Sequence, residues 1–331
     1  MKKYNWGIVG TGWIAHDMAD AINAVNGEIY AAANNNEKSV DEFAEEKHVK
    51  HIFTDPDEMI ENPNIDIIYI ATPNMSHYAY IKKALKAGKN VFCEKPITVN
   101  AKQFDEVAKL AKEKHLILTE GFTLYHMPIY KKVKDLIKDG KLGQIKMIQI
   151  NFGSLKDYDP SNRFFSKRLA GGALLDIGGY ATAFAMEFLD EYPESITTSV
   201  KFFETGVDEQ SGIILKNSKG QMAVMSLSMR AKQPKRGLVS GTKGYVEIGQ
   251  YPRATRADIT YTASAHEEDH DYIEAGKSYE ALQYEVRDFE RYIEQGHDDG
   301  QLEKSRAIAH ILNSVRVAWG LKFPYDNENE L

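Results

Sequence analysis

The 331-residue sequence predicts an α/β protein of two domains: a doubly wound parallel sheet in residues 1–120, and an α+β domain with a large, mostly antiparallel open sheet in residues 121–331. The chain is longer than one hydrophobic core usually serves, which favours two domains. Over the first third, apolar runs alternate with segments of helical period, whereas short segments of alternating polarity dominate from residue 195 onward. The change of pattern near residue 120 places the boundary.

In residues 1–120 the expected strands are short and apolar throughout, and segments with a helical spacing of apolar residues follow most of them. Strands of this composition joined by crossover helices are typical of a parallel sheet that is covered on both faces. We expect strands at residues 6–9, 29–33, 65–70, 90–93 and 116–119, and helices at 14–25, 40–47, 77–87 and 101–114.

Residues 121–331 begin with a helix and a strand and then change character. An amphipathic helix is expected at 128–139, a strand at 145–152, a loop at 153–170 and an apolar helix from Gly171 to about residue 189. Segments of alternating polarity, separated by turn residues, then predict an antiparallel sheet built of hairpins, and two helices close the chain. These strands are expected at 198–203, 212–215, 222–229, 238–240, 245–248 and 259–262, and the helices at 279–294 and 303–321.

Composition excludes several classes of protein. With 43% hydrophobic and 27% charged residues the chain can fold around a core, and its net charge of −7 argues against a nucleic acid or an anionic membrane as partner. The single cysteine, Cys93, can form neither an internal disulfide nor a cysteine-based zinc site, and packing at the end of a buried strand is its expected role. No signal-like segment opens the sequence and no apolar stretch reaches the ~18–20 residues of a membrane span, so we expect a cytoplasmic protein.

The clearest motif directly follows the first expected strand and opens the first expected helix. Glycines there permit a tight turn and let backbone N–H groups approach a pyrophosphate, whose charge the N-terminus of the helix favours. A G-x-G-x-x-A sequence in this position predicts that the domain binds a dinucleotide. The residues expected at the cofactor are Gly10, Thr11, Gly12, Trp13 and Ile14.

The end of the second strand normally distinguishes NAD from NADP, because an acidic side chain there accepts from the ribose 2′-hydroxyl and a basic one binds the 2′-phosphate. This chain has neither an acid nor an arginine at that point, but Asn34 and Asn35, which can hydrogen-bond either form. Lys38 could add positive charge toward a phosphate, so the sequence favours NADP slightly. A solvated helix residue is the alternative role of Lys38.

Two later strand ends carry polar clusters. In an open parallel sheet, ligands bind beyond the carboxyl ends of the strands, so both clusters fall on the same edge as the glycine loop. An ammonium beside a nicotinamide could lower the pKa of an acid or polarise a substrate hydroxyl, so Lys95 is either catalytic or half of a structural ion pair. The clusters, both expected to contact the cofactor, are Thr72, Pro73, Asn74 and His77 after one strand and Glu94 and Lys95 after the next.

A glycine-rich apolar segment, residues 171–180, stands out in the second domain. Asp176 and Tyr180 are four residues apart, a spacing that puts a carboxylate and a phenol on one face of a helix. An aspartate in an apolar segment is costly to bury unless it has a task or a partner. A helix-capping Asp176 beside a packed Tyr180 is the alternative.

Together these motifs resemble the Gfo/Idh/MocA oxidoreductases, the glucose-fructose oxidoreductase/inositol dehydrogenase family, over nearly the whole chain. The glycine loop, the Thr72 and Lys95 clusters, the turn at 140–143 and the segment 171–180 occur in the family's order and spacing. The resemblance implies an N-terminal Rossmann domain and reversible hydride transfer between NAD or NADP and a hydroxyl-bearing carbon of a sugar, polyol or cyclic diol. Tyr180, where inositol-type members have histidine, is similar to the branch of dihydrodiol and xylose dehydrogenases.

The resemblance also implies a catalytic set of Lys95, Asp176 and Tyr180. A tyrosine, with an ordinary pKa of about 10, is a weak base at neutral pH unless a cation depresses that value, and Lys95 is the candidate cation. Tyr180 would take the hydroxyl proton, and Asp176 would fix the substrate or orient the other two residues. Arg163, in the preceding loop, could hold substrate hydroxyls, but the sequence favours an exposed loop arginine.

One rival function and one decoy motif accompany this interpretation. A non-catalytic dinucleotide-binding regulator of the same fold is the rival, and the presence of the whole catalytic set argues against it. Residues 266–270 match the H-E-x-x-H zinc pattern, but their strand-like flanks predict a charged hairpin turn, and no metal is expected. Because the family often pairs its open sheets across a two-fold axis, we expect a homodimer or a dimer of dimers.

Overall fold

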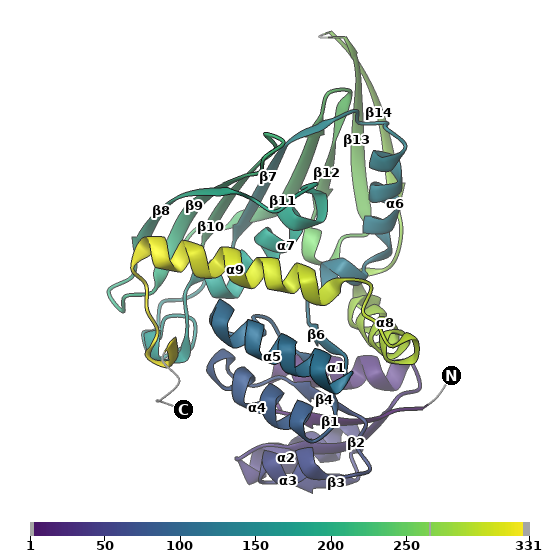
Figure 1. The fold of residues 1–331 in the computed structure, drawn as a ribbon, viewed down its shortest axis with the longest axis vertical. Helices are drawn as coiled ribbons and strands as arrows, with labels where there is room; N and C mark the ends of the chain where they lie inside the picture. The colour runs from purple at the N-terminus through teal and green to yellow at the C-terminus, as the bar shows by residue number, and fades with distance from the viewer. Residues whose placement is uncertain (1–2, 265, 327–331) are drawn as a thin grey trace. The chain divides into compact units, whose positions relative to one another are not determined.

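The computed structural model describes residues 3–264 and 266–326 and divides into two compact units, whose helices and strands are labelled in Figure 1 where there is room. The first unit consists of the described residues through Gly121 together with Leu282–Arg306. The second consists of Phe122–Ala281 and the described residues from Ala307 onward. The predicted boundary assigned residues 282–306 to the second domain, so that assignment is corrected: the chain returns to the first unit at residues 282–306, and residues 307–326 belong to the second.

The first unit contains a six-stranded parallel sheet with the order β3-β2-β1-β4-β5-β6, as the sequence predicts for a doubly wound domain. The strand order reverses between β1 and β4, and dinucleotides bind beyond the strand ends at such a switch point. The apolar pattern did not indicate β3 and α3, because β3 is three residues long and mostly exposed. The strands are β1 (Asn5–Val9), β2 (Glu28–Ala33), β3 (His51–Phe53), β4 (Ile67–Ile70), β5 (Asn90–Cys93) and β6 (Leu118–Glu120); the helices are α1 (Trp13–Ala24), α2 (Glu37–Lys47), α3 (Pro56–Glu61), α4 (Asn74–Lys86) and α5 (Ala101–Lys114).

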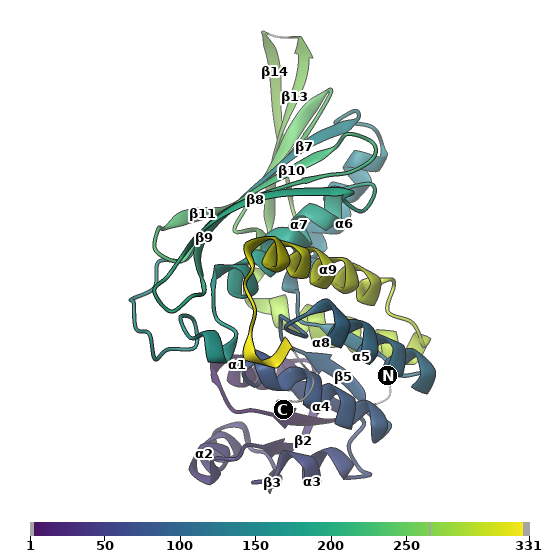
Figure 2. The same cartoon turned by 60° about the vertical axis from the view of Figure 1, so that its left-hand side comes forward.

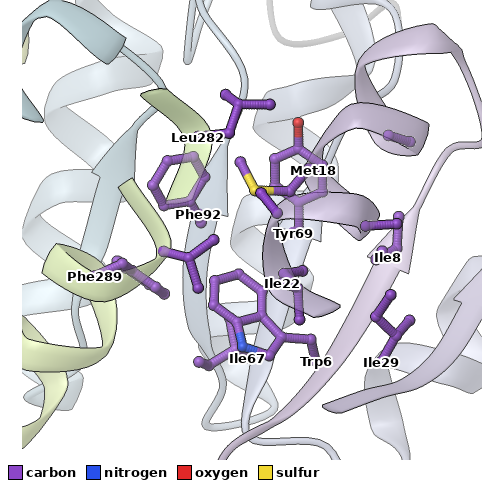
Figure 3. Packing of buried hydrophobic residues seen from close by; sticks show 14 of the residues in the cluster. Trp6, Ile8, Met18, Ile22, Ile29, Ile67, Tyr69, Phe92, Leu282 and Phe289 are labelled. Carbon is purple, nitrogen blue, oxygen red and sulfur yellow. The ribbon is translucent and has the colours of Figure 1, made fainter. Parts of the chain in front are cut away.

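Helix α8 (Ala281–Gln295) completes the core of the first unit, which explains why residues 282–306 belong to it. The Phe289 ring lies 5.7 Å from Trp6 of β1 and meets Phe92 of β5 edge-on at 5.2 Å. Figure 3 shows these side chains with Leu282 in one continuous apolar cluster. Burying a large aromatic ring contributes about 1.5–3 kcal/mol, so α8 is a structural part of the unit although it is distant in sequence.

The second unit contains an eight-stranded sheet with the order β14-β13-β12-β11-β7-β10-β9-β8. Only β7 and β10 pair in parallel, and the other neighbouring strands pair antiparallel, which confirms the predicted mostly antiparallel sheet. The strands are β7 (Ile145–Gly153), β8 (Ser195–Phe202), β9 (Asp208–Lys216), β10 (Met222–Ser228), β11 (Gln233–Gly241), β12 (Gly244–Gly249), β13 (Arg256–Ser264) and β14 (Glu267–Glu274). The helical elements are η1 (Thr123–His126), α6 (Pro128–Lys138), η2 (Lys167–Leu169), η3 (Leu174–Gly178), α7 (Gly179–Phe188), η4 (Tyr251–Arg253), η5 (Ser278–Glu280), α9 (Gln301–Trp319, from Ala307 in this unit) and η6 (Pro324–Asp326).

Helices α6 and α7 lie on one face of this sheet, as Figure 2 shows with the sheet nearly edge-on. Along β10, residues that face the helices are buried, among them Ala223 and Met225, whereas Val224 between them is partly exposed on the other face. Contrary to the expectation from sequence, the stretch Lys167–Phe188 is long and apolar enough by composition to cross a membrane. In the structure 78% of its apolar window is buried, so these side chains serve the core of the unit.

Candidate active site

The loop between β1 and α1 has the geometry of a pyrophosphate cradle. Gly10 has a φ of +96°, and a Cβ there would lie 2.5 Å from the carbonyl oxygen of Ala71, so only glycine lets this loop approach the end of β4. At Gly12, no described atom lies within 4 Å of where a Cβ would be. Among the described residues no side chain caps the first turn of α1, and that turn holds no acidic residue. Uncapped N–H groups beside open space fit a dinucleotide phosphate.

The neighbouring predicted cofactor residues differ in exposure. Trp13 begins α1 with 67% of its side chain exposed, and Ile14 is half-buried. Thr11 is buried, and its hydroxyl lies 2.6 Å from the Ser39 hydroxyl at the start of α2. Thr11 therefore fixes the loop to the next crossover, while Trp13 lies open to a ligand.

The end of β2 is held together by its own amides. Asn34 donates to the Thr11 hydroxyl at 2.6 Å and accepts from the backbone N–H of Asn36 at 3.0 Å. Asn35 is exposed. Lys38 is 84% exposed and pairs with Glu42 one turn along the helix at 3.6 Å, which is the solvated role that the sequence left as an alternative. The two residues that directly follow β2 thus offer neither a carboxylate to a ribose hydroxyl nor a guanidinium to a phosphate.

His77 joins the two predicted polar clusters. Its ring is fully buried, with Nδ1 2.8 Å from the Pro96 carbonyl and Nε2 2.8 Å from the Thr72 carbonyl. The Ser76 hydroxyl also donates to the Thr72 hydroxyl at 2.7 Å, and Asn74 starts α4. The buried ring of His77 therefore joins the loops after β4 and β5, and direct contact with a ligand, as the sequence predicted, is not what its surroundings favour.

Lys95 lies half-buried after β5, and its peptide bond to Pro96 is cis. Its neighbour Glu94 accepts a 2.7 Å hydrogen bond from the Tyr69 phenol, whose pKa is raised by burial and by Glu94. Glu120 at the end of β6 is buried and accepts from the backbone N–H of Ile97 at 2.9 Å. Burial raises the pKa of Glu120 to about 7, while the positive charge of Lys95 acts to lower it. Lys95 therefore interacts electrostatically with a carboxyl group that changes charge near neutral pH.

In the second unit, the predicted helix from Gly171 begins differently from expectation. Residues Leu174–Gly178 form a π-helical turn, η3, before α7. The Asp208 carboxylate of β9 accepts a hydrogen bond from the Leu174 N–H at 2.7 Å. Gly172 has a φ of +111°, and a Cβ at this position would lie 2.1 Å from a carboxylate oxygen of Asp208, so the close approach requires glycine. Burial raises the pKa of Asp208 to about 7. The simple four-residue helix spacing of Asp176 and Tyr180 is thus replaced by a π-turn, a feature often found at functional sites.

Asp176 and Tyr180 each contact a residue that no local motif marks. The Tyr180 hydroxyl lies 2.8 Å from the hydroxyl of Thr123, which is buried in η1, and its ring meets Phe122 edge-on at 5.4 Å. The Asp176 carboxylate lies 3.9 Å from the Lys156 ammonium. These pairs connect segments that are far apart in sequence, so sequence reasoning missed Thr123 and Lys156.

Arg163 and residues 266–270 complete the sequence-based candidates. Arg163 is exposed, with its guanidinium 4.1 Å from the centre of the Phe164 ring. His266 lies in the turn between β13 and β14, but Glu267–His270 belong to β14, where His270 pairs with Thr260, so the predicted turn is shorter than expected. Extended backbone cannot give the two histidines the spacing of a helix, and no group of three metal-binding side chains occurs among the described residues.

Two family models match most of the chain. Residues 4–122 match the oxidoreductase family with an NAD-binding Rossmann fold, and residues 130–247 match the GFO/IDH/MocA C-terminal domain. Among relatives, the trans-1,2-dihydrobenzene-1,2-diol dehydrogenase of Xenopus tropicalis is 34% identical over 73% of this chain and 74% of its own length. The human enzyme of that name is 28% identical over 97% of this chain and 98% of its own length.

Solved structures share the whole architecture. Levoglucosan dehydrogenase in complex with NADH and levoglucosan superposes with a TM-score of 0.88 at 19% identity, covering 97% of this chain and 98% of the other. KijD10, a 3-ketoreductase from Actinomadura kijaniata in complex with NADP and TDP-benzene, gives a TM-score of 0.85 at 22% identity, covering 96% of this chain and 98% of the other. At these identities the similarity establishes the fold.

Proposed function

Because this chain belongs to the Gfo/Idh/MocA oxidoreductase family and is an NAD(P)-dependent dehydrogenase, we propose that Lys95, Asp176 and Tyr180 act together on a hydroxyl-bearing carbon of a sugar, polyol or cyclic diol. The dihydrobenzenediol dehydrogenase name of the relatives supports a diol or a sugar-like substrate. The rival, a non-catalytic regulator, has no support, since the named relatives are dehydrogenases and reductases.

The first unit fits the cofactor that this reaction needs. When bound, the nicotinamide dinucleotide supplies the carbon that accepts or returns hydride. The open space at Gly12 and the uncapped start of α1 would hold its pyrophosphate, and the exposed Trp13 would border it. Both NAD and NADP are compatible with the residues after β2, and a slight preference for NADP would require the Lys38 ammonium to exchange Glu42 for the 2′-phosphate.

Tyr180 is the proposed acid-base residue, and its hydrogen bond with Thr123 is the observation that carries this assignment. A hydroxyl 2.8 Å away can donate to the phenolate as it forms, which favours the charged state. Tyr180 is half-buried, so its oxygen can be shielded from bulk water and still reach a ligand. In the oxidation direction the phenolate of Tyr180 would take the substrate hydroxyl proton while hydride leaves the carbon that bears that hydroxyl.

Lys95 and Asp176 have supporting roles in this proposal. Lys95 would supply the positive charge that stabilises the phenolate of Tyr180, and its place after β5 is held by Glu94 and by the buried His77. Asp176 would accept hydrogen bonds from substrate hydroxyls, since its side chain is 15% exposed and lies 3.9 Å from the Lys156 ammonium.

The experiment that tests the function is a screen of the purified protein against sugars, polyols and cyclic diols with NAD and with NADP, followed by nicotinamide absorbance. We expect turnover with at least one substrate and its loss in Tyr180→Phe. A Tyr180→Phe protein with near wild-type turnover would assign the proton transfer to another residue. Dinucleotide binding without turnover of any hydroxyl substrate would instead favour the alternative function, a non-catalytic dinucleotide-binding regulator.

We further propose a homodimer, or a dimer of dimers, formed through the open face of the eight-stranded sheet. Val224 and Ile214 lie opposite each other on this face, and Leu238 lies on it across β7; all three are half-buried aliphatic side chains. Such a surface is costly to leave in water. Light scattering should give at least twice the single-chain mass of 37.4 kDa, and Val224→Glu should reduce it to that mass. A wild-type monomer at micromolar concentration would contradict this.

The cytoplasm is the proposed location. The support is that the chain's one cysteine, Cys93, is buried and its thiol pKa is raised by burial, so the fold uses no disulfide and keeps an unreactive thiol. Fractionation of the source cells with an antibody would test it, and recovery in an exported fraction would overturn it.

A further inference from the structure

One end of the eight-stranded sheet gathers positive charge next to Asp176. Three strand ends meet there, because Gly153 at the end of β7 is paired with Ser228 of β10 and with Gln233 of β11. Arg230 follows β10 and donates to the carbonyl oxygen of Lys156 at 2.6 Å, which ties the two loops together. We call Lys156, Lys232, Lys235 and Arg253 the cationic cluster.

The charge of this cluster departs from that of the chain. The protein as a whole is acidic, with a net charge of −7, yet residues 229–236 hold four basic and no acidic residues. Arg236 is neutralised by Glu247, which it contacts directly. Within the described parts of the chain, Lys232, Lys235 and Arg253 form no ion pair with a carboxylate. Lys156 has Asp176 at 3.9 Å and also lies 3.7 Å from the centre of the Phe164 ring.

The members of the cluster act on one another. The Lys235 ammonium lies half-buried, 5.0 Å from the centre of the Phe152 ring. Its pKa is lowered by burial and then by the positive charges of Lys232, Arg253 and Lys156, and Asp176 is the carboxylate that acts in the opposite direction. Like charges that act on one another destabilise the folded chain, and a bound anion would relieve that repulsion.

We propose that the cationic cluster binds an anionic group of the substrate, a phosphoryl ester or a carboxylate, while Asp176 next to it binds a substrate hydroxyl. The proposal rests on the function assigned above and narrows its substrate class to phosphorylated sugars or sugar acids. Lysine ammonium groups bind such oxygens as point charges and so tolerate different positions of the group on the sugar. The neutral parent sugars should bind more weakly because they leave the repulsion in place.

The test is calorimetric titration of matched pairs: glucose against glucose 6-phosphate, glucose 1-phosphate and gluconate, and ribose against ribose 5-phosphate. The protein is saturated with NAD or NADP, whichever binds more tightly, so that phosphates cannot compete at the glycine loop. We expect at least one anionic member to bind about tenfold or more tightly than its neutral parent, and this preference to weaken as salt is raised. The phosphates and gluconate separate the two anion types.

The variant is Lys232→Gln with Lys235→Gln, which should remove most of that preference. The matched control is Lys146→Gln with Lys243→Gln, which deletes the same charge from exposed lysines at the opposite end of β7 and β11. A panel without any preference for an anionic member, or a preference that survives in the Lys232/Lys235 variant, overturns the inference. A preference for an anionic member that is lost in the Lys232/Lys235 variant alone supports the inference. It does so even if none of the bound compounds is oxidised, because failure of oxidation would count against the proposed dehydrogenase substrate and not against anion binding.

Discussion

The dinucleotide loop of the first unit and the Asp176–Tyr180 region of the second are built by different means. Around the loop, backbone geometry and a closed set of hydrogen bonds fix each part: Gly10 packs on Ala71, Asn34 holds Thr11, and His77 bridges two carbonyls. Around Asp176, side chains from separate strand ends meet, and several of them are cations that pair with no carboxylate in the described parts of the chain.

This difference fits what we propose each region binds. A phosphate is recognised by N–H groups that nearly every residue has, so the first region depends on where side chains are absent. A particular hydroxylated substrate is recognised by charge and hydrogen-bonding groups, so the second region depends on which side chains are present. Replacements should therefore act on shape in the first region and on chemistry in the second.

The largest effect should come from filling the open space of the loop. Gly12→Val should abolish binding of NAD and NADP with little change in the melting temperature, because a Cβ there has no described atom within 4 Å and the side chain would occupy the place of the pyrophosphate. Gly10→Val is the contrasting variant: its φ of +96° and its approach to Ala71 predict a destabilised fold. Calorimetry and thermal unfolding would separate the two. Unchanged dinucleotide affinity in folded Gly12→Val would remove the loop from the cofactor site.

In the second region, removing one oxygen should matter more than any change of shape. Tyr180→Phe should keep the fold and dinucleotide affinity while turnover falls by roughly 10² to 10⁴, the usual contribution of a general acid or base.

Lys95→Met should slow turnover and raise the apparent pKa of the pH–rate profile, because the positive charge that favours the phenolate is lost. A profile that does not shift in Lys95→Met would separate Lys95 from the proton transfer.

A smaller effect is expected where the second region is anchored. Asp208→Ala leaves the Leu174 N–H without its partner and should lower the free energy of unfolding by about 1–3 kcal/mol. Asp208→Asn tests the charge alone. Burial raises the pKa of Asp208 from its ordinary 3.8 to about 7, so between pH 3.8 and about pH 7 the folded protein keeps a proton on this carboxyl that the unfolded chain has released. The contribution of Asp208 to the free energy of unfolding therefore falls as pH rises through this range. The free energy of unfolding, measured by denaturation at several values between pH 4 and pH 8, should change less with pH in Asp208→Asn than in the wild type. An equal change in both proteins would show that Asp208 is ionised when folded.

The smallest effect should come from Lys38, on the edge of the first region. Its ammonium is 84% exposed and already pairs with Glu42, so Lys38→Ala should weaken NADP binding by about two- to fivefold and leave NAD binding unchanged. Lys50→Ala, another exposed lysine of the same unit, is the control. An equal loss of affinity for NAD and NADP in Lys38→Ala would contradict the predicted preference for NADP.

Local sequence was sufficient where the chemistry is local. The glycine loop lies between a strand and a helix, Lys95 follows a strand end, and Tyr180 lies in a glycine-rich segment, so motif and position predict their surroundings within a few residues. Periodicity likewise predicted both sheets, because burial on one or two faces leaves a regular pattern in each strand. It failed at β3, which is too short and exposed to show one.

The sequence by itself therefore determined the two-sheet architecture, the dinucleotide loop and the identity of the candidate catalytic residues. Only the tertiary structure showed that α8 belongs to the first core, that Thr123 reaches Tyr180, that Asp208 anchors a π-turn before α7, and that Lys156 lies 3.9 Å from Asp176 while Lys235 interacts with Lys156, Lys232 and Arg253. The physical reason is that these contacts join segments tens to hundreds of residues apart, and the sheet register that brings them together is set by side-chain packing across strands, which no single segment records.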